Sequence, residues 1–176
     1  MIEQLKEYLI SLYQEVPVSV YEALAFMFCL GAVLILAFYG LKKGLRFSSR
    51  LLLVEYVFLI FCSTVIFRSF DENCGHNFHP FWSYAAIAEG REDLILENIM
   101  NVVAFVPVGM LLAIAFRSMS WWKALLIGCC LSVGIEAMQY FFHRGFSEFD
   151  DVMHNTVGCL IGFGIISILR IIFKTR

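Results

Sequence analysis

Long apolar stretches constrain this chain more than any other feature of its sequence. A helix through each of them would hold about 17 to 24 residues and cover roughly 25 to 36 Å, close to the hydrocarbon thickness of a bilayer, about 30 Å. The stretches run from Val18 to Leu41, Leu51 to Phe67, Leu94 to Phe116, Trp121 to Phe142 and Val152 to Phe173. The pattern predicts an all-α, polytopic membrane bundle of about five transmembrane helices.

Composition supports a membrane protein and excludes other classes. Hydrophobic residues make up 60% of the chain and charged residues 16%, with a mean hydropathy of +0.78. A soluble domain averages about half apolar and about a quarter charged residues, so too little polar surface is present here to cover a water-soluble globule. The formal net charge of -2 disfavours a broadly basic nucleic-acid-binding protein.

The first 17 residues differ from the rest. Ile2, Leu5, Leu9, Leu12 and Val16 recur at steps of three and four, which predicts a helix with one apolar stripe and one charged face. Such a helix lies along the membrane surface. We therefore divide the chain into an interfacial amphipathic helix at 1–17 and a transmembrane domain at 18–176.

The cations in the short connections predict the orientation. Lys and Arg side chains gather in the first and third connections and in the carboxyl-terminal tail, and such residues favour the cytoplasmic side. The second and fourth connections are acidic or mixed. The sequence thus predicts an outside amino terminus and a cytoplasmic carboxyl terminus. The cations concerned are Lys42, Lys43, Arg46, Arg50, Arg117, Lys123, Arg170, Lys174 and Arg176.

Polar side chains within or next to the spans fall on the outward side. A charge at the middle of a bilayer costs about 2.5 to 3.5 kcal/mol on insertion scales. Polar residues that gather on one side of several spans therefore indicate a structural or functional role. Four predicted helices contribute the residues Arg68, Glu97, Asn98, Asn101, Glu136, Gln139, Arg144, Asp150, Asp151, His154 and Asn155.

Spacing along these helices sharpens the prediction. Residues three or four apart share one face of a helix. The pairs at that spacing are Glu97 with Asn101, Glu136 with Gln139, and Asp151 with Asn155. We expect the three faces to meet in a shared polar interior.

A structural network is the alternative interpretation, held by ion pairs such as Arg144 with Asp151 or Arg68 with Glu97. An interhelical hydrogen bond in a membrane contributes only about 0.6 kcal/mol, which is less than the insertion cost of one carboxylate. This comparison favours a functional site.

Three motifs carry a resemblance to a known family. The segment from Asn101 to Gly109 resembles the N-x-x-x-F-x-P-x-G signature of VanZ-like membrane proteins, and Glu136-Ala137-Met138-Gln139 resembles their E-x-x-Q. Phe149-Asp150-Asp151-Val152, followed by Asn155-Thr156-Val157-Gly158 and Gly162, is similar to the family's D-x-x-D-V-x-x-N-x-x-G-x-x-x-G. Asp151 and Asn155 stand at the matching places, while Asp150 stands beside the usual register. Arg68 and Asn77-Phe78-His79-Pro80-Phe81 are similar to an outer-loop basic residue and an N-L-x-P-F motif. The resemblance covers about residues 50 to 165.

The resemblance implies a protein of the bacterial cytoplasmic membrane associated with resistance to lipoglycopeptide antibiotics of the teicoplanin kind. Such resistance concerns peptidoglycan precursors outside the membrane, the side on which the polar residues are expected.

Two main hypotheses follow for the site. In the first, Glu136 and Asp151 act as a catalytic carboxylate pair, while Arg68 or Arg144 holds an anionic group of a lipid-linked wall precursor or lipid headgroup. No motif identifies a nucleophile, and a divalent cation such as Mg²⁺ or Ca²⁺ on Glu97, Glu136 and Asp151 is permitted but not required.

In the second hypothesis the pocket binds a lipid, a precursor or an antibiotic without chemistry. Hydrogen bonds to the ligand would then come from Asn98, Asn101, Gln139 and Asn155. A transporter is a weaker third interpretation, because the inner halves of the spans carry few polar groups and five helices give no inverted repeat.

Overall fold

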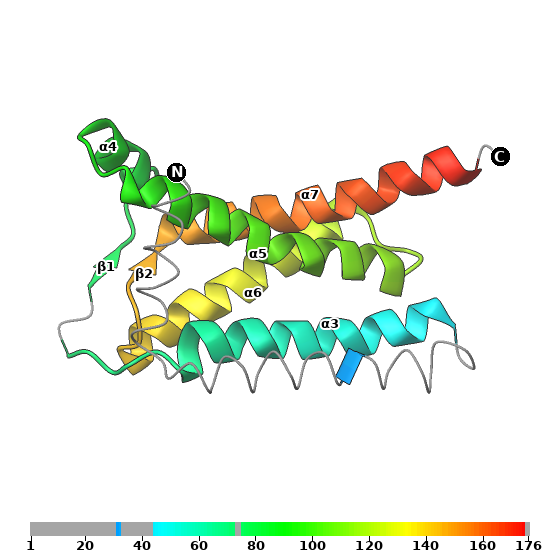
Figure 1. Cartoon of the computed structure of the whole chain (residues 1–176), viewed down its shortest axis with the longest axis horizontal. Coiled ribbons are helices and arrows are strands. Elements are labelled where there is room, and N and C mark those ends of the chain that lie inside the picture. The colour runs from blue at the N-terminus through cyan, green and yellow to red at the C-terminus, as the bar shows by residue number, and fades with distance from the viewer. Residues whose placement is uncertain (1–30, 33–43, 73–74, 175–176) are drawn as a thin grey trace.

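Four long helices form the described part of the chain. The computed structural model describes residues 31–32, 44–72 and 75–174. The predicted amphipathic helix at 1–17 and almost all of the first predicted span lie outside the described residues. The remaining spans correspond to α3 (Leu45–Phe61) with its π-helical extension η2 (Cys62–Ile66), α5 (Asp93–Ala115), α6 (Trp121–Phe142) and α7 (Phe149–Lys174), shown in Figure 1.

Each of these four helical segments is long and apolar enough to cross a membrane. The prediction of an all-α membrane bundle is therefore confirmed. The α6 helix has the predicted bounds, and α5 begins and ends one residue before the predicted span. The α7 helix begins at Phe149, earlier than predicted, so Asp150 and Asp151 lie in its first turn, where the helix dipole favours negative charge.

The α5 and α7 helices make the most extensive contact of the bundle. Gly158 and Gly162 on α7 lie directly against the backbone of α5. A Cβ atom at Gly158 would overlap the Val102 carbonyl oxygen, and one at Gly162 would overlap that of Val106. Close approach through small residues is a common way for membrane helices to associate, and here it fixes the distance between the two helices.

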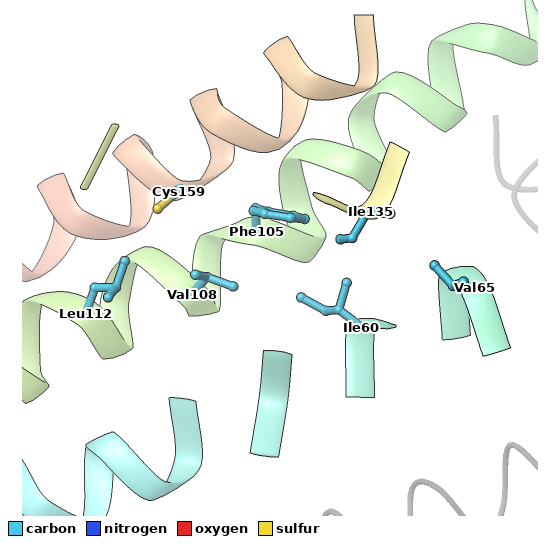
Figure 2. Packing of buried hydrophobic residues seen from close by; sticks show 7 residues of the cluster. All are labelled: Ile60, Val65, Phe105, Val108, Leu112, Ile135 and Cys159. Carbon is cyan, nitrogen blue, oxygen red and sulfur yellow. The ribbon is translucent and has the colours of Figure 1, made fainter. Parts of the chain in front are cut away.

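Apolar side chains fill the space between α5 and its other neighbours. In Figure 2, Val108 and Phe105 of α5 lie between Cys159 of α7 and Ile60 of α3, with Ile135 of α6 close by. The same α5 helix carries Pro107, which interrupts its hydrogen-bond ladder. In the turn before that proline, the Ala104 carbonyl accepts a hydrogen bond from the Tyr56 hydroxyl of α3 at 3.0 Å.

Short elements cover one end of the bundle. Strand β1 (His76–Asn77) pairs in parallel with β2 (Ser147–Glu148), and α4 (Trp82–Ala88) lies close to them (Figure 1). The carboxyl end of α6 and the amino ends of α5 and α7 lie at this same end. The turn between α5 and α6, the start of α3 and the carboxyl end of α7 lie at the opposite end.

Candidate functional site

An acidic cluster lies under the short elements at one end of the bundle. We use this name for Glu97 on α5, Glu136 on α6, Asp151 on α7 and Glu148 on β2, whose charges interact electrostatically with one another. Three of the four were expected from the sequence. Their elements meet here because α5 and α7 begin, and α6 ends, at the same end of the bundle.

Glu136 is held by the strand that follows its own helix. Its side chain is buried, and its Oε2 atom accepts a hydrogen bond from the Glu148 backbone N–H at 2.8 Å. The Ser147 hydroxyl donates to the Glu136 carbonyl oxygen at 3.1 Å. Strand β2 therefore fixes both the backbone and the carboxylate of Glu136, which is an arrangement that pre-organises an acid or a base.

Asp151 meets α5 as the helical spacing predicted. The Asn101 Nδ2 atom donates to the Asp151 Oδ1 atom at 2.6 Å. One oxygen of this carboxylate is thus positioned by an amide that carries no charge. Asn101 and Asp151 come from the two helices with the closest backbone approach, so their separation is set by the glycine contacts described above.

Arg68 provides positive charge to the acidic cluster. Its guanidinium interacts electrostatically with Glu97, Glu136 and Asp151. The side chain passes over Gly145, which has a φ of 95°, and a Cβ at that position would overlap the guanidinium. Glycine is required there for both reasons, because L side chains rarely adopt positive φ and Arg68 occupies the space.

A π-helical turn brings Arg68 to this position. The hydroxyls of Ser63 and Thr64 both donate to the Ile60 carbonyl, at 2.9 and 2.8 Å. They therefore compete with the backbone N–H group that would bond to this carbonyl in a regular α-helix. The helix widens over η2, and the Phe67 N–H then bonds to the Cys62 carbonyl five residues earlier. Single π turns of this kind are frequent at functional sites.

Gln139 and Arg144 bind backbone carbonyls of this widened turn and of the segment after it. The Gln139 Nε2 atom donates to the Thr64 carbonyl at 3.1 Å, and the Arg144 guanidinium donates to the carbonyls of Ile66 and Arg68. The pairing of Arg144 with Asp151 considered above is absent from the described part of the chain, where Arg91 and Asp93 form the only ion pair. Arg144 is a positioning residue for Arg68.

Two further predicted binding residues form bonds between elements. Asn98 Nδ2 donates to the Ser83 hydroxyl of α4 at 3.2 Å, and Asn155 Nδ2 donates to the Ser132 hydroxyl of α6 at 2.8 Å. Both asparagines are buried. Their amides hold α4 on α5 and α7 on α6.

Glu148 is a member of the cluster that sequence reasoning missed. It is 5% exposed, and its Oε2 atom accepts a hydrogen bond from the Trp82 Nε1 atom at 3.0 Å. Burial raises the pKa of Glu148 to about 8, with a further contribution from the neighbouring carboxyls of Asp151 and Glu97. The protonated form of this side chain can donate a hydrogen bond.

Asp150, the neighbour of Asp151, has a structural role. Its fully buried carboxylate accepts hydrogen bonds from the N–H groups of Phe81 and Ser83 and from the Ser83 hydroxyl, at 2.6 to 2.9 Å. These bonds fix the first turn of α4, whose preceding residue Phe81 has a φ of 65°. On the same side, the Tyr84 hydroxyl lies 2.8 Å from the His154 Nε2 atom.

An apolar groove leads to two of the carboxyl groups. Its volume is about 290 Å³, and Glu136 and Glu148 lie in its wall together with Ser147. The other lining residues are Phe78, Val133, Ala137, Tyr140, Phe141, Phe149 and Val152. Within the described ranges, no group of three His, Cys, Asp or Glu side chains is arranged to hold a metal ion.

Comparison with known proteins identifies the family. The sequence profile of the VanZ/LLP1 family matches residues 26–170. The chain belongs to the VanZ/LLP1 family. Protein VanZ of Enterococcus faecium is 35% identical over 66 residues, a match that covers 38% of this chain and 41% of that protein. The aligned part thus spans about two fifths of that relative's length, and no solved structure gives a significant match.

The VanZ/LLP1 match is wider than the motifs alone indicated. It begins at residue 26, whereas the resemblance read from the sequence began near residue 50 and left the first predicted span outside. The motifs consist of polar residues, glycines and a proline. The first predicted span is a nearly uniform apolar run, so it contains no recognisable motif of this kind. All four residues of the acidic cluster and Arg68 lie within the family match.

Proposed function

We propose that this VanZ-like protein takes a lipid-linked cell-wall precursor or a lipid headgroup from the outer leaflet and acts on it at the acidic cluster, thereby giving resistance to teicoplanin-like lipoglycopeptides. The observation that carries the proposal is the groove, whose walls are apolar and aromatic except at Glu136, Glu148 and Ser147. A groove of this kind suits an amphiphile with a hydrocarbon chain and a polar end.

The residues of the cluster have separate tasks in this proposal. Arg68 neutralises an anionic phosphate or carboxylate of the ligand. Glu148, whose pKa is raised by burial, donates a hydrogen bond to it in the protonated form. Glu136 and Asp151 are the acid and base pair, and hydrogen bonds from the Glu148 backbone N–H and from Asn101 hold their carboxylates.

The test compares membrane lipids and wall precursors of isogenic cells with and without the protein by mass spectrometry. We expect one lipid-linked species to appear or to be depleted when the protein is present. Cells that carry Glu136→Gln at the same membrane level are the matched control and should resemble cells without the protein. An unchanged lipid and precursor profile in fully resistant cells would reject catalysis in favour of binding alone.

The proposal also requires the acidic cluster to face outward, with the amino terminus outside and the carboxyl terminus in the cytoplasm. We expect a membrane-impermeant maleimide to label Glu89→Cys, at the end of α4, in intact cells. Ser118→Cys, in the turn at the opposite end, should react only after permeabilisation. Both variants are made with Cys74→Ser, which removes a native thiol between the second and third predicted spans. The reverse labelling pattern would place the cluster at the cytoplasmic side and contradict the proposal.

A further inference from the structure

A cavity lies at the end of the bundle opposite the acidic cluster. We propose that the protein binds the phosphate headgroup of an anionic membrane lipid in this cavity, which is lined by Arg46, Arg117 and Arg170 and which we call the arginine cavity. This inference does not depend on the proposed function, since the two sites lie at opposite ends of the helices.

The arginine cavity has a volume of about 510 Å³. Its three arginines come from distant parts of the sequence: the first turn of α3, the turn after α5, and the last part of α7. Phe173, which is 68% exposed, completes the described lining. The cavity therefore offers three guanidinium groups beside an apolar wall.

Nearby contacts hold this end of the bundle in place. The Arg170 guanidinium donates to the Ala113 carbonyl, and Arg50 Nε donates to the Ala115 carbonyl at 3.2 Å. These carbonyls belong to the last turn of α5, which has no helical partner for them and carries the negative end of the helix dipole. Arg170 is thus fixed at the cavity before any ligand arrives.

The arginines of the cavity lack acidic partners. In residues 31–32, 44–72 and 75–174 no carboxylate lies within ion-pair distance of Arg46, Arg117 or Arg170. Positive charge gathered without a counter-ion favours an anion, and guanidinium groups bind phosphate oxygens through paired hydrogen bonds. Phe173 and the exposed apolar residues before it on α7 favour a phosphate that carries hydrocarbon chains over a free ion.

The experiment measures lipid binding to the purified full chain in detergent by native mass spectrometry. The probes are phosphatidylglycerol, phosphatidylcholine with the same acyl chains, and inorganic phosphate. We expect the anionic lipid to bind more tightly than the zwitterionic lipid, and inorganic phosphate to compete poorly. Each of Arg46→Gln and Arg117→Gln should weaken phosphatidylglycerol binding about fivefold, and the double variant about thirtyfold.

Lys123→Gln is the matched control, because it removes a cation at the same end whose Nζ atom donates to the Ser118 carbonyl outside the cavity. It should weaken binding less than either arginine variant. Arg46 and Arg117 are exposed, so the variants should keep the wild-type melting temperature. Equal affinity for both lipids, wild-type affinity in the double variant, or displacement of the lipid by equimolar inorganic phosphate would overturn the inference.

Discussion

If the proposed function holds, Asp151→Asn is expected to abolish resistance to teicoplanin, while the protein still reaches the membrane. The substitution preserves the size of the side chain and an oxygen for the hydrogen bond from Asn101, but it removes the ability to exchange a proton. Loss of a general acid or base costs about 10²- to 10⁴-fold in rate. Growth in teicoplanin and turnover of the lipid-linked species are the two measurements.

Glu89→Gln is the control for this prediction. It removes a carboxylate from the same end of the molecule, but Glu89 is exposed at the end of α4 and does not belong to the acidic cluster. We expect it to retain wild-type resistance. If Asp151→Asn and Glu136→Gln both protected cells as well as the unchanged protein, the cluster would have no role in proton transfer.

Gly158→Leu is expected to have the largest effect on stability. A Cβ atom there would overlap the Val102 carbonyl oxygen, and the backbone of α5 cannot move aside without separating α5 from α7. Overpacking typically costs about 1 to 3 kcal/mol of stability. Because this side chain would clash with backbone atoms, we expect a cost of about 3 kcal/mol or more. At about 2 to 4 °C per kcal/mol, the melting temperature in detergent should fall by roughly 10 °C.

Gly134→Leu provides the comparison for this variant. Gly134 lies inside α6, and a Cβ atom added there would meet nothing within 4 Å. The two substitutions therefore add the same side chain to a helical glycine and differ in the space available. Gly158→Ala, which adds a single methyl group, should fall between them. Equal melting temperatures for Gly158→Leu and Gly134→Leu would show that close approach of α5 and α7 is not needed.

The helices were predictable because membrane insertion imposes an apolar length that is visible in a single sequence. The bounds of α6 were predicted correctly, and those of α5 to one residue. The start of α7 was placed too late, because the carboxylates of Asp150 and Asp151 do not look like part of a span. In the structure the Asp150 carboxylate is buried, and it accepts hydrogen bonds from Phe81 and Ser83 at the start of α4.

The candidate site was only partly predictable, and the tertiary contacts explain the difference. Helical spacing correctly put Asn101 and Asp151 on facing helices, but the same spacing could not show that Asn155, one turn later, turns to Ser132. Glu148 could not be found by periodicity, since it lies on a two-residue strand. That strand is positioned by pairing with β1, about 70 residues earlier in the chain.

The extra residue in the turn from Cys62 to Ile66 has a consequence for the direction of everything that follows it. One residue corresponds to about 100° of rotation around a helix axis. If this turn were α-helical, the chain after it would leave α3 in a different direction. The Arg68 guanidinium would then point away from Glu97, Glu136 and Asp151. A homologue that lacks one residue of this turn would therefore need a cation from another helix to balance the carboxylates of its acidic cluster.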